Sequence, residues 1–302
     1  MECIRCSMFP VAVLLALAGC SAEAADDGGD EGSSLTQSLE VGMPHPQAGA
    51  MPTEGGRPGA GHGHHSGVPR AHHDCHAGGR LIEGESAALG TGTVTTWGKL
   101  NARGGIVSVG VTMSSPALEH MDADMTLSVA FPRRVARRTV IDHLGLGFLA
   151  TGHGPEPYLV PHYDVHFYGV PEDVVDSIDC VDEPMPSATA LPSPYFIPGL
   201  GMEPDGTCVP QMGVHALDPT SPELSGSPFT ETLILGYHAG SVIFIEPMIT
   251  QATFASHTSY TRSIPKPESV GRRTQWPTVL TVTYDDEADT HSIVLSDFVA
   301  TN

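Results

Sequence analysis

Hydrophobic and polar residues alternate in short runs through most of the chain after about residue 88, and Gly and Pro interrupt these runs. Alternation with a period of two is typical of β-strands, because successive side chains leave a strand on opposite faces. We therefore predict strands over residues 91–99, 105–113, 125–131, 139–148, 159–168, 230–235, 241–246, 278–284 and 291–298. The turn residues that follow 230–235 and 278–284 predict two antiparallel hairpins.

Helical periodicity is scarce in the same part of the chain. Residues 172–178 follow Pro171 and begin with acidic side chains, which predicts one or two helical turns. Residues 183–210 carry many prolines and predict a loop. The pattern predicts a single, mostly β domain over residues 80–302, either an antiparallel β-sandwich or a barrel-like sheet with one or two short helices. An α+β fold is the alternative.

The predicted strand at 159–168 has an unusual polar face. His162, Asp164 and His166 occupy every second position and are flanked by Val, Phe and Tyr. Because side chains at i, i+2 and i+4 leave the same face of a strand, these three line up. A buried polar cluster has to be paired or coordinated to be tolerated. The run therefore predicts a polar site set into an apolar sheet.

The N-terminal residues predict export. Residues 8–19 form an apolar segment after Arg5, and about 12 residues suit a signal-peptide core but not a membrane-spanning helix. The end of the segment, Leu17-Ala18-Gly19-Cys20, resembles the lipobox of bacterial lipoproteins. We predict a signal peptide over residues 1–19, lipidation of Cys20 and attachment to a bacterial outer membrane or cell surface through this anchor. The alternative is an ordinary signal peptide with an incidental Cys20.

Residues 20–79 are rich in Gly, Ala, Asp, Glu, Pro and His and poor in aromatic and β-branched residues. Such a composition cannot bury enough surface to offset the entropy of ordering, so we predict a disordered tether. Its segments 61–65 and 72–76 concentrate histidines. The tether is either a simple spacer or a tail that gathers transition metals.

Cysteine placement predicts one disulfide, since an exported chain folds where disulfides persist. Cys180 and Cys208 flank the Pro-rich segment, and a bridge between them closes a loop of about 28 residues. Cys75 lies in the His-rich tether and is interpreted as free or unordered.

The formal net charge of −21 argues against a nucleic-acid partner, because such binding needs clustered Lys and Arg to neutralise phosphates. The charge favours solubility and attraction of cations. Two basic pairs, Arg133-Arg134 and Arg137-Arg138, are interpreted as an exposed loop.

Five segments are similar to successive motifs of a bacterial domain family of unknown function, typified by a small Thermus protein under extracytoplasmic sigma-factor control. These segments are 152–158, 160–168, 209–215, 218–224 and 244–250. The resemblance covers most of residues 88–284. In the family a Glu directly follows the His of the Gly-His motif, whereas Gly154 and Pro155 separate His153 from Glu156 here. The resemblance implies a domain and a site without a settled activity.

His and carboxylate residues in these motifs predict a divalent-metal site, because His with Asp or Glu is the usual ligand set of catalytic zinc. On a regular strand the Cα atoms of His162 and His166 are about 13 Å apart, so both reach one ion only with strain. Residues two positions apart converge easily. We expect either His162 with Asp164 or Asp164 with His166 to bind the ion.

The remaining ligands have to come from other segments. His215 is the best third ligand, and Glu246 is the best fourth ligand or general base. We predict zinc as the ion, with four ligands: His162, Asp164, His215 and Glu246. Glu246 and His166 are the candidate catalytic groups, and His153 and Glu156 are expected to support the ligands.

A metal-free interpretation of the same residues stays open. An Asp between two imidazoles can satisfy itself in a hydrogen-bonded ladder, and His215 can bond a backbone carbonyl. His143 and His291 are interpreted as residues on strand surfaces, and His238 as a hairpin-turn residue without a neighbour.

The sequence contains no nucleophile elbow, phosphate loop or dinucleotide fingerprint. The leading hypothesis is an envelope lipoprotein whose zinc site hydrolyses or lyses a small substrate. One alternative is a non-catalytic envelope protein that binds a small molecule or assembles as a homo-oligomer. Another is a metal scavenger in which the tail does the binding.

Overall fold

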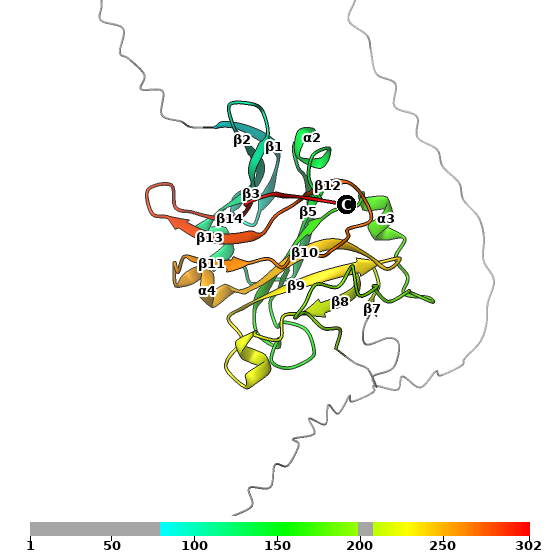
Figure 1. Cartoon of the computed structure of the whole chain (residues 1–302). Coiled ribbons are helices and arrows are strands. Elements are labelled where there is room, and N and C mark those ends of the chain that lie inside the picture. Colours follow the sequence, from blue (N-terminus) through cyan, green and yellow to red (C-terminus); the bar gives the residue numbers. More distant parts are fainter. Residues whose placement is uncertain (1–78, 199–207) are drawn as a thin grey trace, which may run out of the picture. The chain divides into compact units, whose positions relative to one another are not determined.

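Two antiparallel sheets form the frame of the structure (Figure 1). In this computed structural model residues 79–198 and 208–302 are described. The first sheet has the order β1 (Arg80–Leu89), β2 (Gly92–Leu100), β3 (Ile106–Ser114), β14 (Thr290–Ser296), β13 (Val279–Asp285) and β11 (Tyr260–Ser263). The second has the order β4 (Met125–Ala130), β5 (His143–Leu149), β6 (His162–Tyr168), β10 (Ser241–Thr250), β9 (Glu231–His238), β8 (Gly213–Leu217) and β7 (Cys208–Val209).

Short elements complete the described ranges. A two-stranded sheet pairs β12 (Thr274–Trp276) with β15 (Val299–Thr301). The helices are α1 (Ser115–Glu119), α2 (Arg133–Ala136), α3 (Glu172–Asp176), α4 (Gln251–Ala255) and the 3₁₀ turn η2 (Pro222–Ser225). Among the described residues, no helix is long and apolar enough to cross a membrane. The predicted signal peptide, Cys20, residues 20–78 of the predicted tether and Cys75 lie outside the described residues.

The prediction of a mostly β, antiparallel architecture is confirmed. Both predicted hairpins form, as β9 with β10 and as β13 with β14. Strand β1 was not predicted, because its sequence RLIEGESAAL has few β-branched residues and no clean alternation. Pairing with β2 holds it in the sheet, where it forms an exposed edge strand.

Strand β10 extends four residues beyond its predicted end and includes Pro247. Proline lacks a backbone N–H and cannot donate to a neighbouring strand. Strand β10 pairs with β6 at Phe244 and Ile245 and again at Met248, but not at Glu246 or Pro247. The ladder is thus interrupted next to His166, which lies opposite Glu246 if the register is carried across the gap.

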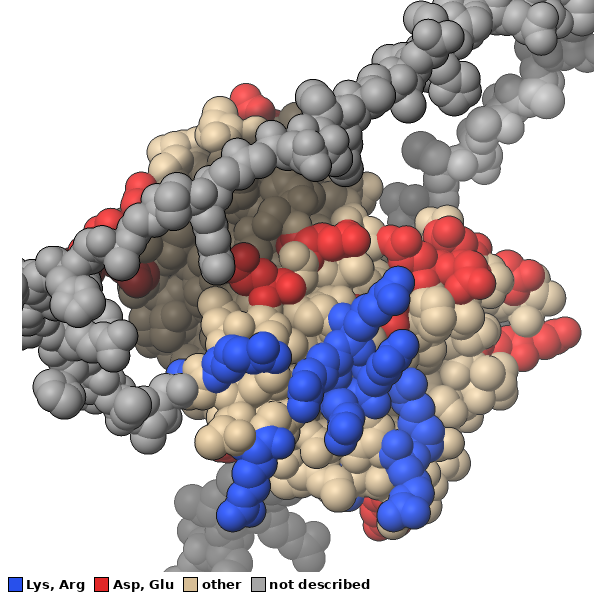
Figure 2. Space-filling model, turned by 90° about the horizontal axis from the view of Figure 1, so that it is seen from above, with Lys and Arg blue, Asp and Glu red and all other residues tan. Residues whose placement is uncertain are grey.

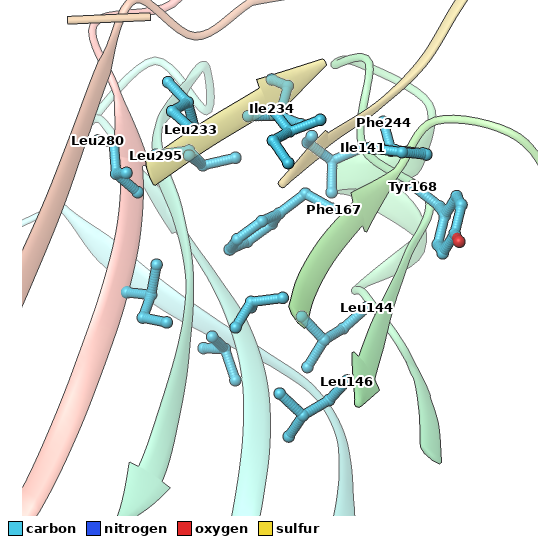
Figure 3. Close-up of a cluster of buried hydrophobic side chains, with 14 of the residues drawn as sticks. Ile141, Leu144, Leu146, Phe167, Tyr168, Leu233, Ile234, Phe244, Leu280 and Leu295 are labelled. Atoms are coloured by element: carbon cyan, nitrogen blue, oxygen red, sulfur yellow. The ribbon is translucent and has the colours of Figure 1, made fainter. Parts of the chain in front are cut away.

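The apolar core lies on the face of the second sheet that is opposite the polar residues of β6. Tyr163, Val165 and Phe167 alternate with those polar residues and are fully buried. In Figure 3 the Phe167 ring points into the cluster formed with Leu144 and Leu146, whereas the Tyr168 ring points away. Strand β6 is consequently buried on both faces, one apolar and one polar.

Basic residues gather on one side of the protein despite its negative charge (Figure 2). The interpretation of Arg133-Arg134 as part of a loop was wrong, because both residues lie on α2. Val135, the next residue of this helix, is buried. Burial of one apolar side chain fixes this short helix and leaves the arginines exposed. A hollow beside it is lined in part by Arg80, Arg103 and Arg134.

The predicted disulfide between Cys180 and Cys208 is present. It joins the segment after α3 to β7 at the edge of the second sheet.

Replacing Cys180 and Cys208 by Ala should lower the free energy of unfolding by about 3–4 kcal/mol, because the bridge closes a 28-residue loop in the unfolded chain. Urea unfolding followed by circular dichroism measures the difference. The variant Cys75→Ala is the control and should unfold like the wild type. A loss below about 1 kcal/mol would show that loop closure contributes little here.

Candidate metal centre

The polar face of β6 has room for its side chains because the neighbouring strand β5 carries glycines there. Gly145 pairs with His166 and Gly147 pairs with Asp164. A Cβ atom at Gly145 would lie 2.8 Å from the ring of Tyr168, so a larger residue would crowd this face. The glycines therefore leave space above β5 into which the imidazole and carboxylate side chains can extend.

The first group of possible ligands consists of His153, His162 and Asp164. The Nε2 atom of His162 lies 3.2 Å from Asp164 Oδ1, and the Nε2 atom of His153 lies 3.5 Å from Asp164 Oδ2. One carboxylate thus faces two imidazoles. His162 is fully buried, whereas the side chain of His153 is 40% exposed.

The loop between β5 and β6 brings His153 back to the strand. Gly152 has a φ of +68° and packs so tightly on the backbone of Tyr158 and Val160 that a Cβ atom would collide. The hydroxyl of Tyr158 donates to Glu223 Oε1 at 3.2 Å, which fastens the loop to η2. These contacts hold His153 over the polar face.

The second group consists of His166, His215 and Glu246, from β6, β8 and β10. The Nε2 atom of His166 lies 3.4 Å from Glu246 Oε1, and the Nε2 atom of His215 lies 4.0 Å from Glu246 Oε2. Gly213 has a φ of +90° and would collide with Tyr237 if it carried a Cβ atom, so glycine is required two residues before His215.

Aromatic rings fix the orientation of the buried imidazoles. The ring of His162 meets the ring of Phe229 edge-on at 5.6 Å, and the ring of His166 meets Phe244 edge-on at 4.8 Å. Tyr168 stacks on His166 with ring centroids 5.1 Å apart. Edge-on and offset contacts of this kind are the preferred arrangements of aromatic pairs. The Nε2 atoms are therefore held toward the carboxylates.

Several buried polar atoms of the two groups have no hydrogen-bond partner among the described residues. They are Asp164 Oδ1, Glu246 Oε2 and the Nε2 atoms of His162 and His166. Buried polar atoms are normally paired, because leaving one unpaired costs about 1–3 kcal/mol. Four such atoms on one face indicate that a proton or a cation is expected between them.

The other ring nitrogen of three histidines lies against a backbone carbonyl. His153 Nδ1 is 2.9 Å from Gly154 O, His162 Nδ1 is 2.7 Å from Val160 O, and His215 Nδ1 is 3.0 Å from Gly213 O. A neutral imidazole that donates from Nδ1 presents a lone pair at Nε2. Metal-binding histidines commonly make this contact with a backbone carbonyl, which fixes the tautomer.

Electrostatics keep the histidines of the second group neutral. Burial lowers the pKa of His166 to about 4, and burial also lowers the pKa of His215 to about 4. Burial, together with the nearby charge of Asp164, raises the pKa of Glu246 well above 4.5. At neutral pH the metal-free group therefore holds neutral imidazoles beside a carboxyl group that tends to keep its proton.

In the first group the electrostatics favour the charged forms of the side chains instead. Burial alone would raise the pKa of Asp164, but the adjacent His153 and His162 lower it below its usual range. The same contact with Asp164 raises the pKa of His153, although burial opposes the change. The charge of Asp164 also acts on His166 and Glu246, so the two groups are electrostatically one site.

The structure divides the four ligands assigned from the sequence between two groups. His162 and Asp164 lie together, whereas His215 and Glu246 lie together with His166. His153, expected to support the ligands, belongs to the first group itself. Glu156 is exposed in the loop between β5 and β6 and belongs to neither group.

Three histidine interpretations need correction. His291 and His143 are buried rather than on strand surfaces, with exposed fractions of 1% and 5%. The alternation of β14 could have revealed this, because His291 shares a face with the buried Ile293 and Leu295. His238 has a neighbour after all, since its Nδ1 atom lies 2.9 Å from Glu183 Oε2.

Sequence reasoning missed a third group, formed by Glu119, His257 and His291. Its members come from α1, from the turn after α4 and from β14. They share no motif and lie far apart in the sequence, so only the fold could bring them together.

Comparisons of the chain with protein-family models, with curated proteins and with solved structures gave no significant match. The resemblance to the bacterial domain family stays a prediction.

Replacing Glu246 by Gln should alter how the stability of the metal-free protein depends on pH. The pKa of Glu246 is raised in the folded state, so its contribution to stability is present below about pH 4.5 and is lost as pH rises through the folded-state pKa. As pH rises above about 4.5, wild type should therefore lose stability relative to Glu246→Gln.

Urea unfolding in the presence of a chelator measures this difference, with Glu156→Gln as the exposed control. Parallel pH profiles of wild type and Glu246→Gln would contradict a raised pKa at Glu246.

Proposed function

We propose that this protein binds zinc on the polar face of β6, with one ligand set formed by His153, His162 and Asp164 and a neighbouring one by His166, His215 and Glu246. The observation that supports the proposal best is the set of unpartnered Nε2 and carboxylate atoms that face one another in these groups. Nitrogen and oxygen donors of this kind suit zinc and related divalent ions.

Catalysis is the use of this site that we favour. Catalytic zinc sites have three protein ligands and keep one position open for water or substrate, and each group here offers three. Bound zinc would supply Lewis-acid assistance to the hydrolysis or lysis of a small substrate. His153 is the member with an exposed side chain, so a substrate would approach along it. With zinc in the set formed by His153, His162 and Asp164, Glu246 would be the neighbouring group that accepts and returns a proton.

We further propose that the protein works in the bacterial cell envelope, attached to the outer membrane or cell surface through lipidated Cys20. The disulfide between Cys180 and Cys208 supports this location, because disulfides persist in oxidising compartments. The lipobox-like sequence before Cys20 supports the anchor.

A non-catalytic role is the second candidate, and one observation favours it. Because burial raises the pKa of Glu246, a protonated Glu246 can donate to His166 without any metal. The site would then be a structural network in an envelope protein that binds a small molecule or assembles with copies of itself.

Zinc content distinguishes these candidates. His162→Gln and His215→Gln should each reduce the zinc bound per chain, measured by plasma emission after gel filtration, because each removes a ligand from one set. His120→Gln is the control, since His120 is exposed and belongs to none of the three groups.

A chain that lacks residues 20–78 tests whether the tail is responsible. Zinc that stays with the shortened chain and is reduced by His162→Gln or His215→Gln supports the site on β6, and zinc that disappears with the tail supports a scavenging role. A folded, zinc-free shortened chain would contradict the proposed centre.

A further inference from the structure

Glu119, His257 and His291 converge where the two sheets are joined by their short helices. Helix α1 directly follows β3 of the first sheet, and α4 directly follows β10 of the second. The side-chain amide of Gln251 on α4 donates to Leu118 O at 3.2 Å and to Met121 O at 2.8 Å. The third group therefore lies at a junction between the sheets.

Both histidines of this group point one nitrogen at the same carboxylate oxygen. The Nε2 atom of His257 lies 2.8 Å from Glu119 Oε1, and the Nε2 atom of His291 lies 3.5 Å from it. The Ser115 hydroxyl also donates to this oxygen. The candidate ligand atoms of the three residues all lie within 4.8 Å of one another.

A metal-free network does not explain the environment of the His291 ring. It is 1% exposed, and neither of its ring nitrogens has a hydrogen-bond partner among the described residues. A hydrogen bond between His257 and Glu119 would satisfy those two residues and leave His291 unpaired. An imidazole buried in this state is destabilising unless something else binds it.

Neighbouring side chains hold the two imidazoles in place. His257 stacks on Tyr284 with ring centroids 3.7 Å apart, and Phe254 meets His291 edge-on at 5.0 Å. The hydroxyl of Tyr284 donates to Asp289 Oδ1 at 3.1 Å. Asp289 adds negative charge close to His291, which favours a cation at this position.

We propose that Glu119, His257 and His291 bind a zinc ion that fastens the turn after α4 to the first sheet. This site is separate from the one on β6. We assign it a fastening role because of where its ligands lie: His291 is on β14, Glu119 is on the helix after β3, and His257 is in the turn after α4. Two imidazoles and one carboxylate supply three ligands. The side chain of His257 is 41% exposed, so a solvent molecule can complete the coordination.

The variant His257→Asn tests the proposal in the full-length chain. His257 has a φ of +55°, a conformation that Asn tolerates, so the backbone is preserved while the ligand is removed. After loading with Zn²⁺ and gel filtration, the variant should hold about one zinc per chain fewer than wild type. Glu119→Gln, which keeps the shape of the side chain, should lose the same amount.

Thermal unfolding tests the structural role. Excess zinc should raise the Tm of wild type through this site by about 5–10 °C, and His257→Asn should lack that part of the rise. His120→Asn is the control: it removes an exposed histidine next to Glu119 and should leave both zinc content and Tm unchanged.

Unchanged zinc content in folded His257→Asn and Glu119→Gln would overturn the proposal, and a lost equivalent without a change in the zinc-dependent Tm would overturn its structural role. Every variant keeps residues 20–78, so any zinc bound by the tail is the same in all of them. These outcomes are also independent of His162→Gln and His215→Gln, so failure of the site on β6 is recognised separately.

Discussion

The polar face of β6 depends on one electrostatic constraint: imidazole nitrogens and carboxylate oxygens face each other at buried positions. His162 and His166 are buried together with Asp164 and Glu246. Lone pairs at such short range repel unless a proton or a cation lies between them. The backbone carbonyls behind the Nδ1 atoms determine which nitrogen carries that lone pair.

The fold accommodates this face by giving β6 two different environments. On one side Val165 and Phe167 belong to the apolar core, which keeps the strand in a fixed register. On the other side the glycines of β5 give the imidazoles room, and Pro247 interrupts the ladder with β10. Apolar packing thus supplies the stability that the polar side does not.

Much of the architecture was readable from the sequence, because period-two patterns and turn residues act locally. The alignment of His162, Asp164 and His166 followed from strand geometry alone. The division of the ligands did not follow, because it depends on the loop that returns His153 and on the register that sets Glu246 opposite His166. The group around His291 was invisible for the same reason, since tertiary packing alone brings Glu119 and His257 to it.

The position of Glu246 affects how fast a ligand could enter or leave the polar face of β6. Glu246 pairs with Ile234 of β9, and β10 pairs with β6 on either side of Glu246, at Ile245 and Met248, so the sheet cannot open there without breaking pairs with both strands. The loop that carries His153 is attached mainly through its own tight turn and the hydroxyl of Tyr158. The exchange rate of the proposed ligand is therefore expected to follow local opening of this loop rather than unfolding of the domain.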